Sequence, residues 1–88
     1  MIIRNALICN RLGLHARAAA KLVQLANQYQ SQVFLSTDKM SANAKSILGV
    51  LTLAAGKDTP LVIEVDGPDE QEAMDQIVAL IENRFGED

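Results

Sequence analysis

The sequence contains one histidine, His15, and an arginine follows two residues later, at Arg17. The pattern after His15 is that of a helix, so the imidazole lies beside backbone N–H groups that have no intrahelical partner. These N–H groups and the helix dipole favour an anion, and a guanidinium binds phosphate oxygens. A neutral imidazole, whose ordinary pKa is about 6.5, is a nucleophile near pH 7. The combination indicates a phosphoryl group carried on His15.

Other roles for His15 stay open on sequence alone. A single histidine before a helix is often a cap or simply a solvent-exposed side chain. A hydrolase that pairs His15 with Ser46 needs a pocket and an oxyanion hole, for which 88 residues leave little room. A metal site needs more His, Cys or carboxylate ligands than this loop offers. We therefore expect no metal and no cofactor.

Composition narrows the class of protein. With 88 residues, of which 49% are hydrophobic and 22% charged, we expect one folded domain spanning 1–88. A net charge of −3 argues against nucleic-acid binding. No apolar run approaches the roughly 18 residues of a membrane span, and no signal-peptide pattern begins the chain. Cys9 is the one cysteine and cannot form a disulfide within the chain, so we expect a cytoplasmic protein.

Apolar patterning predicts the element order β-α-β-β-α-β-α. Strands are expected at 2–9, 32–37, 40–43 and 60–66, and helices at 16–28, at 46–54 and from Asp69 to just before Gly86. Such an order is typical of an α+β fold with helices on one face of a small antiparallel sheet. The helical connection after the first strand predicts that the first two strands are not neighbours. Three elements carry apolar stripes: Ala19, Leu22, Val23 and Ala26; Leu61, Ile63 and Val65; and Met74, Ile77, Val78 and Ile81.

Local signals predict how the helices begin and end. Ser46 suits an N-cap and Gly56 a C-terminal stop for the second helix. Asp69 and Glu72 have the spacing of a capping box for the last helix. Gly13, in the loop before His15, is free to adopt a backbone angle closed to other residues.

Two segments resemble one known family. The run Gly-Leu-His-Ala-Arg at residues 13–17 resembles the active-site motif of the histidine-containing phosphocarrier (HPr) family of the bacterial phosphoenolpyruvate-dependent phosphotransferase system. Residues 45–51, Lys-Ser-Ile-Leu-Gly-Val-Leu, resemble that family's regulatory serine segment. The likeness covers essentially the whole chain. It implies an open-faced β-sandwich of four antiparallel strands in the order 1-4-2-3, with three helices on one side.

The resemblance also implies roles for individual residues. His15 would accept a phosphoryl group on Nδ1 from Enzyme I and pass it to an EIIA-type protein for sugar uptake. Arg17 would hold the phosphoryl oxygens together with the backbone N–H groups of Ala16 and Arg17. Ser46 would be the target of an HPr kinase/phosphorylase. The carrier would be a monomer without turnover of its own, and its partners would contact three apolar residues: Ile47, Leu48 and Leu51.

Other functions remain open, and the sequence departs from the family pattern at several positions. The chain is alternatively a carrier of the nitrogen-related branch, or a regulatory binding module controlled through Ser46. Ser46 is alternatively only an N-cap, and the three apolar residues only core. Ala18 stands where the family usually has proline, which suits the first helical turn. Gln24 and Asn27 stand where many relatives carry positive charge, which bears on how tightly an acidic partner binds.

Overall fold

The computed structural model describes residues 1–87. Within them the chain forms four strands, three α-helices and a final 3₁₀ turn, η1. The elements are β1 (Ile2–Leu7), α1 (Ala16–Ala26), β2 (Gln32–Ser36), β3 (Ser41–Asn43), α2 (Ile47–Thr52), β4 (Pro60–Asp66), α3 (Glu70–Glu82) and η1 (Arg84–Gly86). The predicted element order is therefore confirmed.

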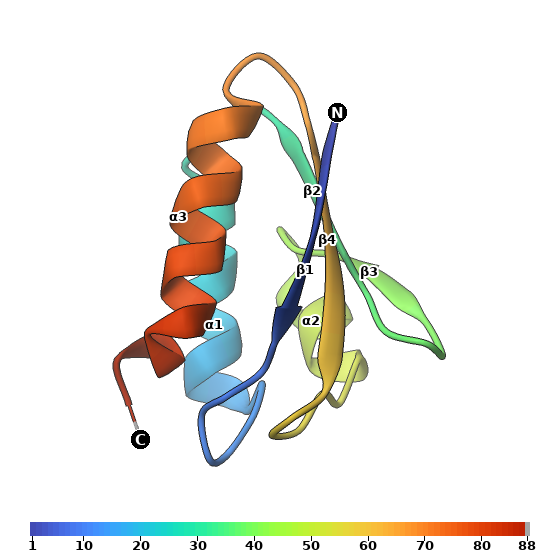
Figure 1. Cartoon of the computed structure of the whole chain (residues 1–88), viewed down its shortest axis with the longest axis vertical. Helices are drawn as coiled ribbons and strands as arrows, with labels where there is room; N and C mark the ends of the chain where they lie inside the picture. The colour runs from blue at the N-terminus through green and yellow to red at the C-terminus, as the bar shows by residue number, and fades with distance from the viewer. Residues whose placement is uncertain (88) are drawn as a thin grey trace.

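The four strands form one antiparallel sheet in the order β1-β4-β2-β3. β4 pairs with β1 from Ile2↔Val65 to Leu7↔Pro60, and with β2 on its other side. α3 packs on β1 and β4, α2 contacts β3, and α1 packs against both other helices (Figure 1). The α+β class, the strand order and the separation of the first two strands are confirmed.

The core lies between the sheet and the helices. Side chains along β2 and β4 alternate between the buried face and the open face, as a half-covered sheet requires. The predicted stripes are buried except for Val23 and Val78, which lie half-buried at the margin of the core. The open face of the sheet exposes four apolar residues: Ile3, Leu7, Phe34 and Val62.

Several of the predicted strands and helices were too long. The strand predicted at 2–9 ends at Leu7, where β1 reaches the first residue of β4. The helix predicted at 16–28 ends at Ala26, because Asn27 caps it with both its backbone N–H and its side-chain amide on the carbonyl of Val23. The strands predicted at 32–37 and 40–43 are each one residue shorter, because Thr37 N–H turns to the carbonyl of Met40.

The prediction of Gly56 as a helix stop was wrong. α2 ends at Thr52, four residues before Gly56, and the left-handed backbone follows at Ala54, with φ +50°. A non-glycine residue in that region is strained. The turn at Ala54 lets the next residue, Ala55, present its carbonyl to the loop that precedes His15.

The predicted capping box of α3 was also wrong. Asp69 is the N-cap residue, but its side chain makes no bond to the helix. Its carboxylate instead accepts hydrogen bonds from the backbone N–H groups of Gln30 and Ser31 and from the Ser31 hydroxyl. Glu70, rather than Glu72, reaches back and accepts from Gly67 N–H at 3.1 Å. The donors of Gln30 and Ser31, which are near Asp69 only in the folded chain, therefore replace the N–H groups of α3 as its partners.

Gly13 fixes the loop that carries His15. Its φ is +67°, and an added Cβ would lie 2.5 Å from the carbonyl oxygen of Ala55. The next residue, Leu14, donates its N–H to that same oxygen at 2.8 Å. The predicted conformational freedom of Gly13 is therefore used, and it allows this loop to sit directly on the segment that follows α2.

Candidate functional site

His15 is the N-cap residue of α1, with extended backbone angles of φ −75° and ψ 179°. Its carbonyl accepts the first helical hydrogen bond, from Ala19 N–H at 2.8 Å. The imidazole makes no bond to the helix. The interpretation of His15 as a helix cap through its side chain is therefore wrong, and the ring is available to other partners.

The partner of the ring is Glu87, which the sequence analysis did not identify. His15 Nε2 lies 2.7 Å from Glu87 Oε1, and the two side chains are 28% and 15% exposed. An ionised carboxylate only accepts hydrogen bonds, so Nε2 carries the proton in this contact. In a neutral imidazole the other nitrogen, Nδ1, then holds the free lone pair.

The backbone after α3 brings Glu87 to this position. Arg84, Phe85 and Gly86 all adopt left-handed backbone angles, with φ of +56°, +54° and +75°. A non-glycine residue in this region costs roughly 1–2 kcal/mol, which the complete burial of the Phe85 ring offsets. The Lys21 ammonium also donates to the Phe85 carbonyl at 2.6 Å. The turn is therefore anchored on both α1 and the core.

Asn10 bonds to the same carboxylate oxygen as His15. Its side chain is fully buried. Its amide Nδ2 donates to Gly13 O at 2.8 Å and to Glu87 Oε1 at 2.9 Å. Hydrogen bonds from Asn10 and then His15 lower the pKa of Glu87 below its ordinary value, so the carboxylate stays ionised.

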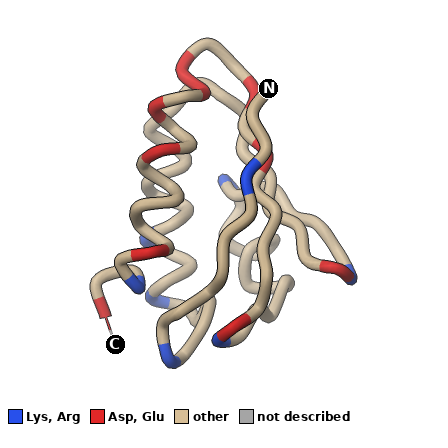
Figure 2. The backbone as a smooth tube through the Cα atoms, in the orientation of Figure 1, with Lys and Arg blue, Asp and Glu red and all other residues tan. Residues whose placement is uncertain are grey.

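A hollow of about 160 Å³ adjoins this group and is lined by Arg11, Leu12, Arg17 and Glu87. Arg17 is exposed, and its guanidinium makes no hydrogen bond or ion pair with residues 1–87. Ala16 and Arg17 form the first turn of α1, whose N–H groups have no intrahelical acceptor. Several Lys and Arg positions lie at this end of the molecule together with a few acidic ones, and further acidic positions follow α3 and the opposite end (Figure 2). The site combines a nucleophilic nitrogen with donors suited to an anion.

Ser46 is the N-cap of α2, as predicted, and its Oγ accepts from Gly49 N–H at 3.2 Å. It shares no hydrogen bond with His15, so the two do not form the catalytic pair of a hydrolase. Three apolar residues after Ser46 are solvent-exposed to different extents: Ile47 is 39% exposed, Leu48 75% and Leu51 36%. The alternative that all three are core is therefore wrong.

The departures from the family pattern lie on α1. Ala18 is fully buried within the helix, and alanine supports helical backbone as well as any residue. Gln24 and Asn27 are exposed, and neither carries a charge, although the Asn27 amide is engaged with the Val23 carbonyl. Ala18 therefore leaves the helix intact. Gln24 and Asn27 make the exposed face of α1 less basic than in relatives that carry positive charge at these positions.

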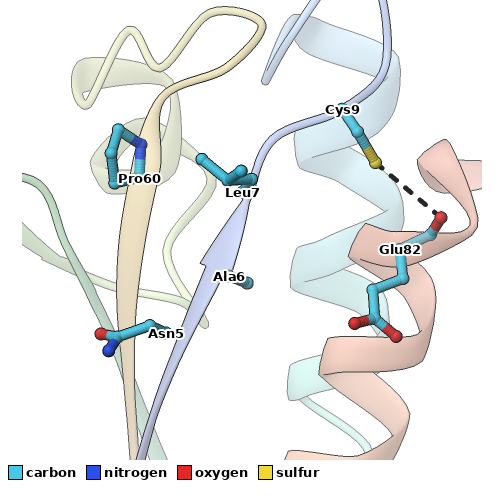
Figure 3. A pocket seen from close by; sticks show the side chains of 6 residues that line it. All are labelled: Asn5, Ala6, Leu7, Cys9, Pro60 and Glu82. Carbon is cyan, nitrogen blue, oxygen red and sulfur yellow. Dashed lines mark hydrogen bonds between the residues drawn. The ribbon is translucent and has the colours of Figure 1, made fainter.

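A larger hollow of about 480 Å³ lies between the edge of β1 and the end of α3 (Figure 3). Cys9 lines it and donates its thiol to the carbonyl of Ile81 at 3.4 Å. None of the residues that line this hollow also lines the hollow beside Glu87.

Residues 1–87 also bring no three His, Cys, Asp or Glu side chains together in a metal-binding group. Across the same described range, no helix is both long and apolar enough to cross a membrane.

Comparison with known proteins identifies the family to which this fold belongs. Residues 2–83 match the family described as PTS HPr component phosphorylation site. The phosphocarrier protein HPr of Cupriavidus necator is 58% identical over 87 residues, covering 99% of this chain and 98% of that protein. A crystal structure of HPr from Thermoanaerobacter tengcongensis has a TM-score of 0.96 at 40% identity, covering 100% of this chain and 99% of the other. An HPr dimer from the same organism has a TM-score of 0.79 at 42% identity, with 91% and 92% covered.

The fold and the site thus define a phosphocarrier whose candidate phosphoryl acceptor lies at the start of a helix. The chain belongs to the HPr family of phosphocarrier proteins of the phosphotransferase system.

Proposed function

We propose that His15 accepts a phosphoryl group on Nδ1 from phosphorylated Enzyme I and passes it to an EIIA-type protein for sugar uptake. The observation that carries this proposal is the contact between His15 Nε2 and Glu87, because it leaves Nδ1 as the nucleophile. The Nδ1 lone pair forms a bond to phosphorus while the P–N bond of the donor phosphohistidine breaks. The electron pair of that bond returns to the donor ring, and the His15 proton stays on Nε2.

Arg17 and the first turn of α1 bind the phosphoryl oxygens in this proposal. Arg17 lines the hollow that Glu87, the partner of the ring, also borders, and a guanidinium is a strong donor to phosphate oxygens. The N–H groups of Ala16 and Arg17 belong to the unpaired first turn. These donors neutralise the charge of the transferred group, while the partner aligns donor and acceptor. The chain therefore acts as a covalent relay without turnover of its own.

Partners dock on the exposed apolar residues of α2 in this proposal. Ile47, Leu48 and Leu51 lie beside the polar N-cap Ser46. Exposed apolar groups with a polar rim are typical of interaction sites. The interface is small and transient, as a relay with fast release requires. We further propose that the carrier is a single domain and a cytoplasmic monomer, although one related HPr structure is described as a dimer.

Ser46 is the second modification site that we propose, as the target of an HPr kinase/phosphorylase. The hydroxyl is exposed on the docking surface. Its Oγ would attack the γ-phosphorus of ATP while the hydroxyl proton passes to a base of the kinase, and the bond to ADP would break. The product adds about −1.5 to −2 charges beside Ile47 and Leu48, where it would repel an acidic partner surface. The alternative, that Ser46 is only an N-cap, is supported by its bond to Gly49.

The test of the carrier function is phosphorylation by phosphoenolpyruvate and purified Enzyme I, with His15→Ala as the control. We expect labelling of the wild type alone, with a product that is labile to acid and stable to base. Replacing the sugar-branch Enzyme I with the nitrogen-branch enzyme distinguishes the sugar carrier from the nitrogen-related alternative. No labelling of folded protein by either enzyme would overturn the relay in favour of a regulatory module controlled through Ser46.

A further inference from the structure

We infer that Glu87 and Asn10 are positioning residues for phosphoryl transfer: Asn10 fixes the Glu87 carboxylate, and that carboxylate holds the His15 ring by Nε2 with Nδ1 free. This inference rests on the proposed carrier function. It concerns two residues outside the active-site motif, of which one precedes His15 in the loop and the other follows the last helix.

The first observation is that Glu87 is held in place rather than lying loosely on the surface. Its carboxylate side chain is 15% exposed. The preceding turn is anchored by the buried Phe85 ring and by the bond from Lys21 to the Phe85 carbonyl. Within the turn, Glu87 N–H also donates to Arg84 O at 2.9 Å. A contact built on a strained and anchored backbone defines the position of the carboxylate closely.

The second observation is that one buried amide joins the carboxylate to the loop that carries His15. Asn10 Nδ2 donates to Gly13 O and to Glu87 Oε1, at 2.8 and 2.9 Å. The Asn10 Oδ1 atom is buried without a hydrogen-bond partner among the described residues. Burying an unpaired carbonyl costs stability. An apolar side chain would avoid that cost, but it would not hold Glu87.

The chemistry of the transfer gives this arrangement a function. When Nδ1 gains the phosphoryl group, the ring keeps its Nε2 proton and becomes an imidazolium. A carboxylate already accepting that proton orients the ring and stabilises its positive charge. Arg11 and Arg17 line the hollow that Glu87 also borders, and their charges oppose repulsion between the carboxylate and the phosphoryl oxygens. Glu87 therefore favours acceptance.

The test uses two phosphoryl donors, Enzyme I with phosphoenolpyruvate and the small molecule phosphoramidate, which needs no docking surface. We expect Glu87→Ala to slow phosphorylation at least about tenfold with both donors. Glu87→Gln keeps an acceptor oxygen without the charge, so its phosphorylation rate should lie between the rates of the wild type and of Glu87→Ala. Glu82→Gln removes the same charge from an exposed position and should leave the rate unchanged.

The role of Asn10 is tested by a double-mutant cycle. Asn10→Ala should slow phosphoramidate labelling in the wild-type background and have no further effect in Glu87→Ala. The ¹⁵N signal of His15 Nε2 should move in Asn10→Ala toward its position in Glu87→Ala. Asn10→Leu removes both donors at a similar side-chain size and adds no buried charge, and it serves if Asn10→Ala does not fold.

The outcomes separate this inference from the carrier function. If neither donor labels the wild type, the carrier function itself fails. If the wild type is labelled and Glu87→Ala is equally fast or faster, the positioning role of Glu87 is overturned. An equal slowing by Asn10→Ala in both backgrounds would assign Asn10 a purely structural role, since its effect would not pass through Glu87.

Discussion

α1 and α2 both begin at a residue with a nucleophilic side chain, and the two residues use the same position differently. Ser46 Oγ bonds to Gly49 N–H and so becomes part of α2. The His15 ring makes no bond to α1 and turns to Glu87, which lies 72 residues later. A serine oxygen, one bond from Cβ, suits the N–H groups of the first helical turn. The imidazole leaves those N–H groups of α1 open to a ligand.

α3 shows a third use of the N-cap position. Asp69 also directs its side chain away from its own helix, but toward the backbone of Gln30 and Ser31. All three contacts of that carboxylate join two parts of the fold. Comparison of the three helices therefore separates a side chain that caps, one that joins segments, and one that bonds to a carboxylate bordering a hollow.

The largest expected effect follows from the replacement of His15. His15→Ala should abolish phosphoryl acceptance, because no other histidine is present. Since the ring makes no cap bond, the free energy of unfolding should fall by less than about 2 kcal/mol. Labelling with phosphoenolpyruvate and Enzyme I measures the first effect, and urea denaturation the second. A larger loss of stability would make His15 a structural residue, comparable to Ser46.

Arg17 should give the next largest effect. Arg17→Ala removes a charged donor from the hollow beside His15, and we expect acceptance to slow by about 100-fold. Arg17→Lys should recover part of the rate, because an ammonium supplies charge without the planar pair of donors. Lys39→Ala, in the exposed turn between β2 and β3, is the matched control for loss of positive charge. Equal rates for Arg17→Ala and Lys39→Ala would remove Arg17 from the site.

Ser46 separates capping from docking. Ser46→Asp keeps a capping oxygen and adds a negative charge, so we expect acceptance from Enzyme I to slow by about tenfold without being blocked. Ser46→Ala should lower the free energy of unfolding by about 1 kcal/mol while leaving transfer unchanged. Single-turnover transfer and thermal unfolding measure the two effects. An unchanged rate in Ser46→Asp would argue against a docking role for this surface.

The smallest effect concerns acid stability at the N-terminus of α3. The Ser31 hydroxyl and then the Gln30 N–H lower the pKa of Asp69 below its ordinary value of 3.8. Its contribution to stability is therefore present above pH 3.8 and is lost as the pH falls through the lower pKa of the folded state. The difference in Tm between wild type and Asp69→Asn should shrink below that pH. A Tm difference that stays constant with pH would contradict this expectation. Asp38→Asn, at an exposed turn, is the control.

The sequence predicts most of the fold because apolar spacing reports burial directly. Leu61, Ile63 and Val65 alternate along β4, and their burial follows from that spacing alone. Helix ends were predicted less well, since a cap competes with every donor that the folded chain brings near. Asp69 matched a capping box by spacing, and the N–H groups of Gln30 and Ser31 took its carboxylate instead.

The site was predictable only in part, for the same reason. His15 and Arg17 are two residues apart, so one local motif contains both. Glu87 reaches His15 through three left-handed residues whose angles no local pattern indicates, since Arg84 and Phe85 are not glycine. The signal that was present is weaker: Asn10 directly follows an apolar run, and a buried amide needs partners.

The close packing at Gly13 has a consequence for how a partner binds. The loop before His15 rests on the carbonyl of Ala55, just beyond the helix that exposes Leu48. The two surfaces are therefore held at a fixed separation before any encounter. A partner that contacts α2 meets the imidazole without ordering a loop, so little conformational entropy is lost on association. The glycine at position 13 thus preorganises the carrier for rapid exchange between donor and acceptor.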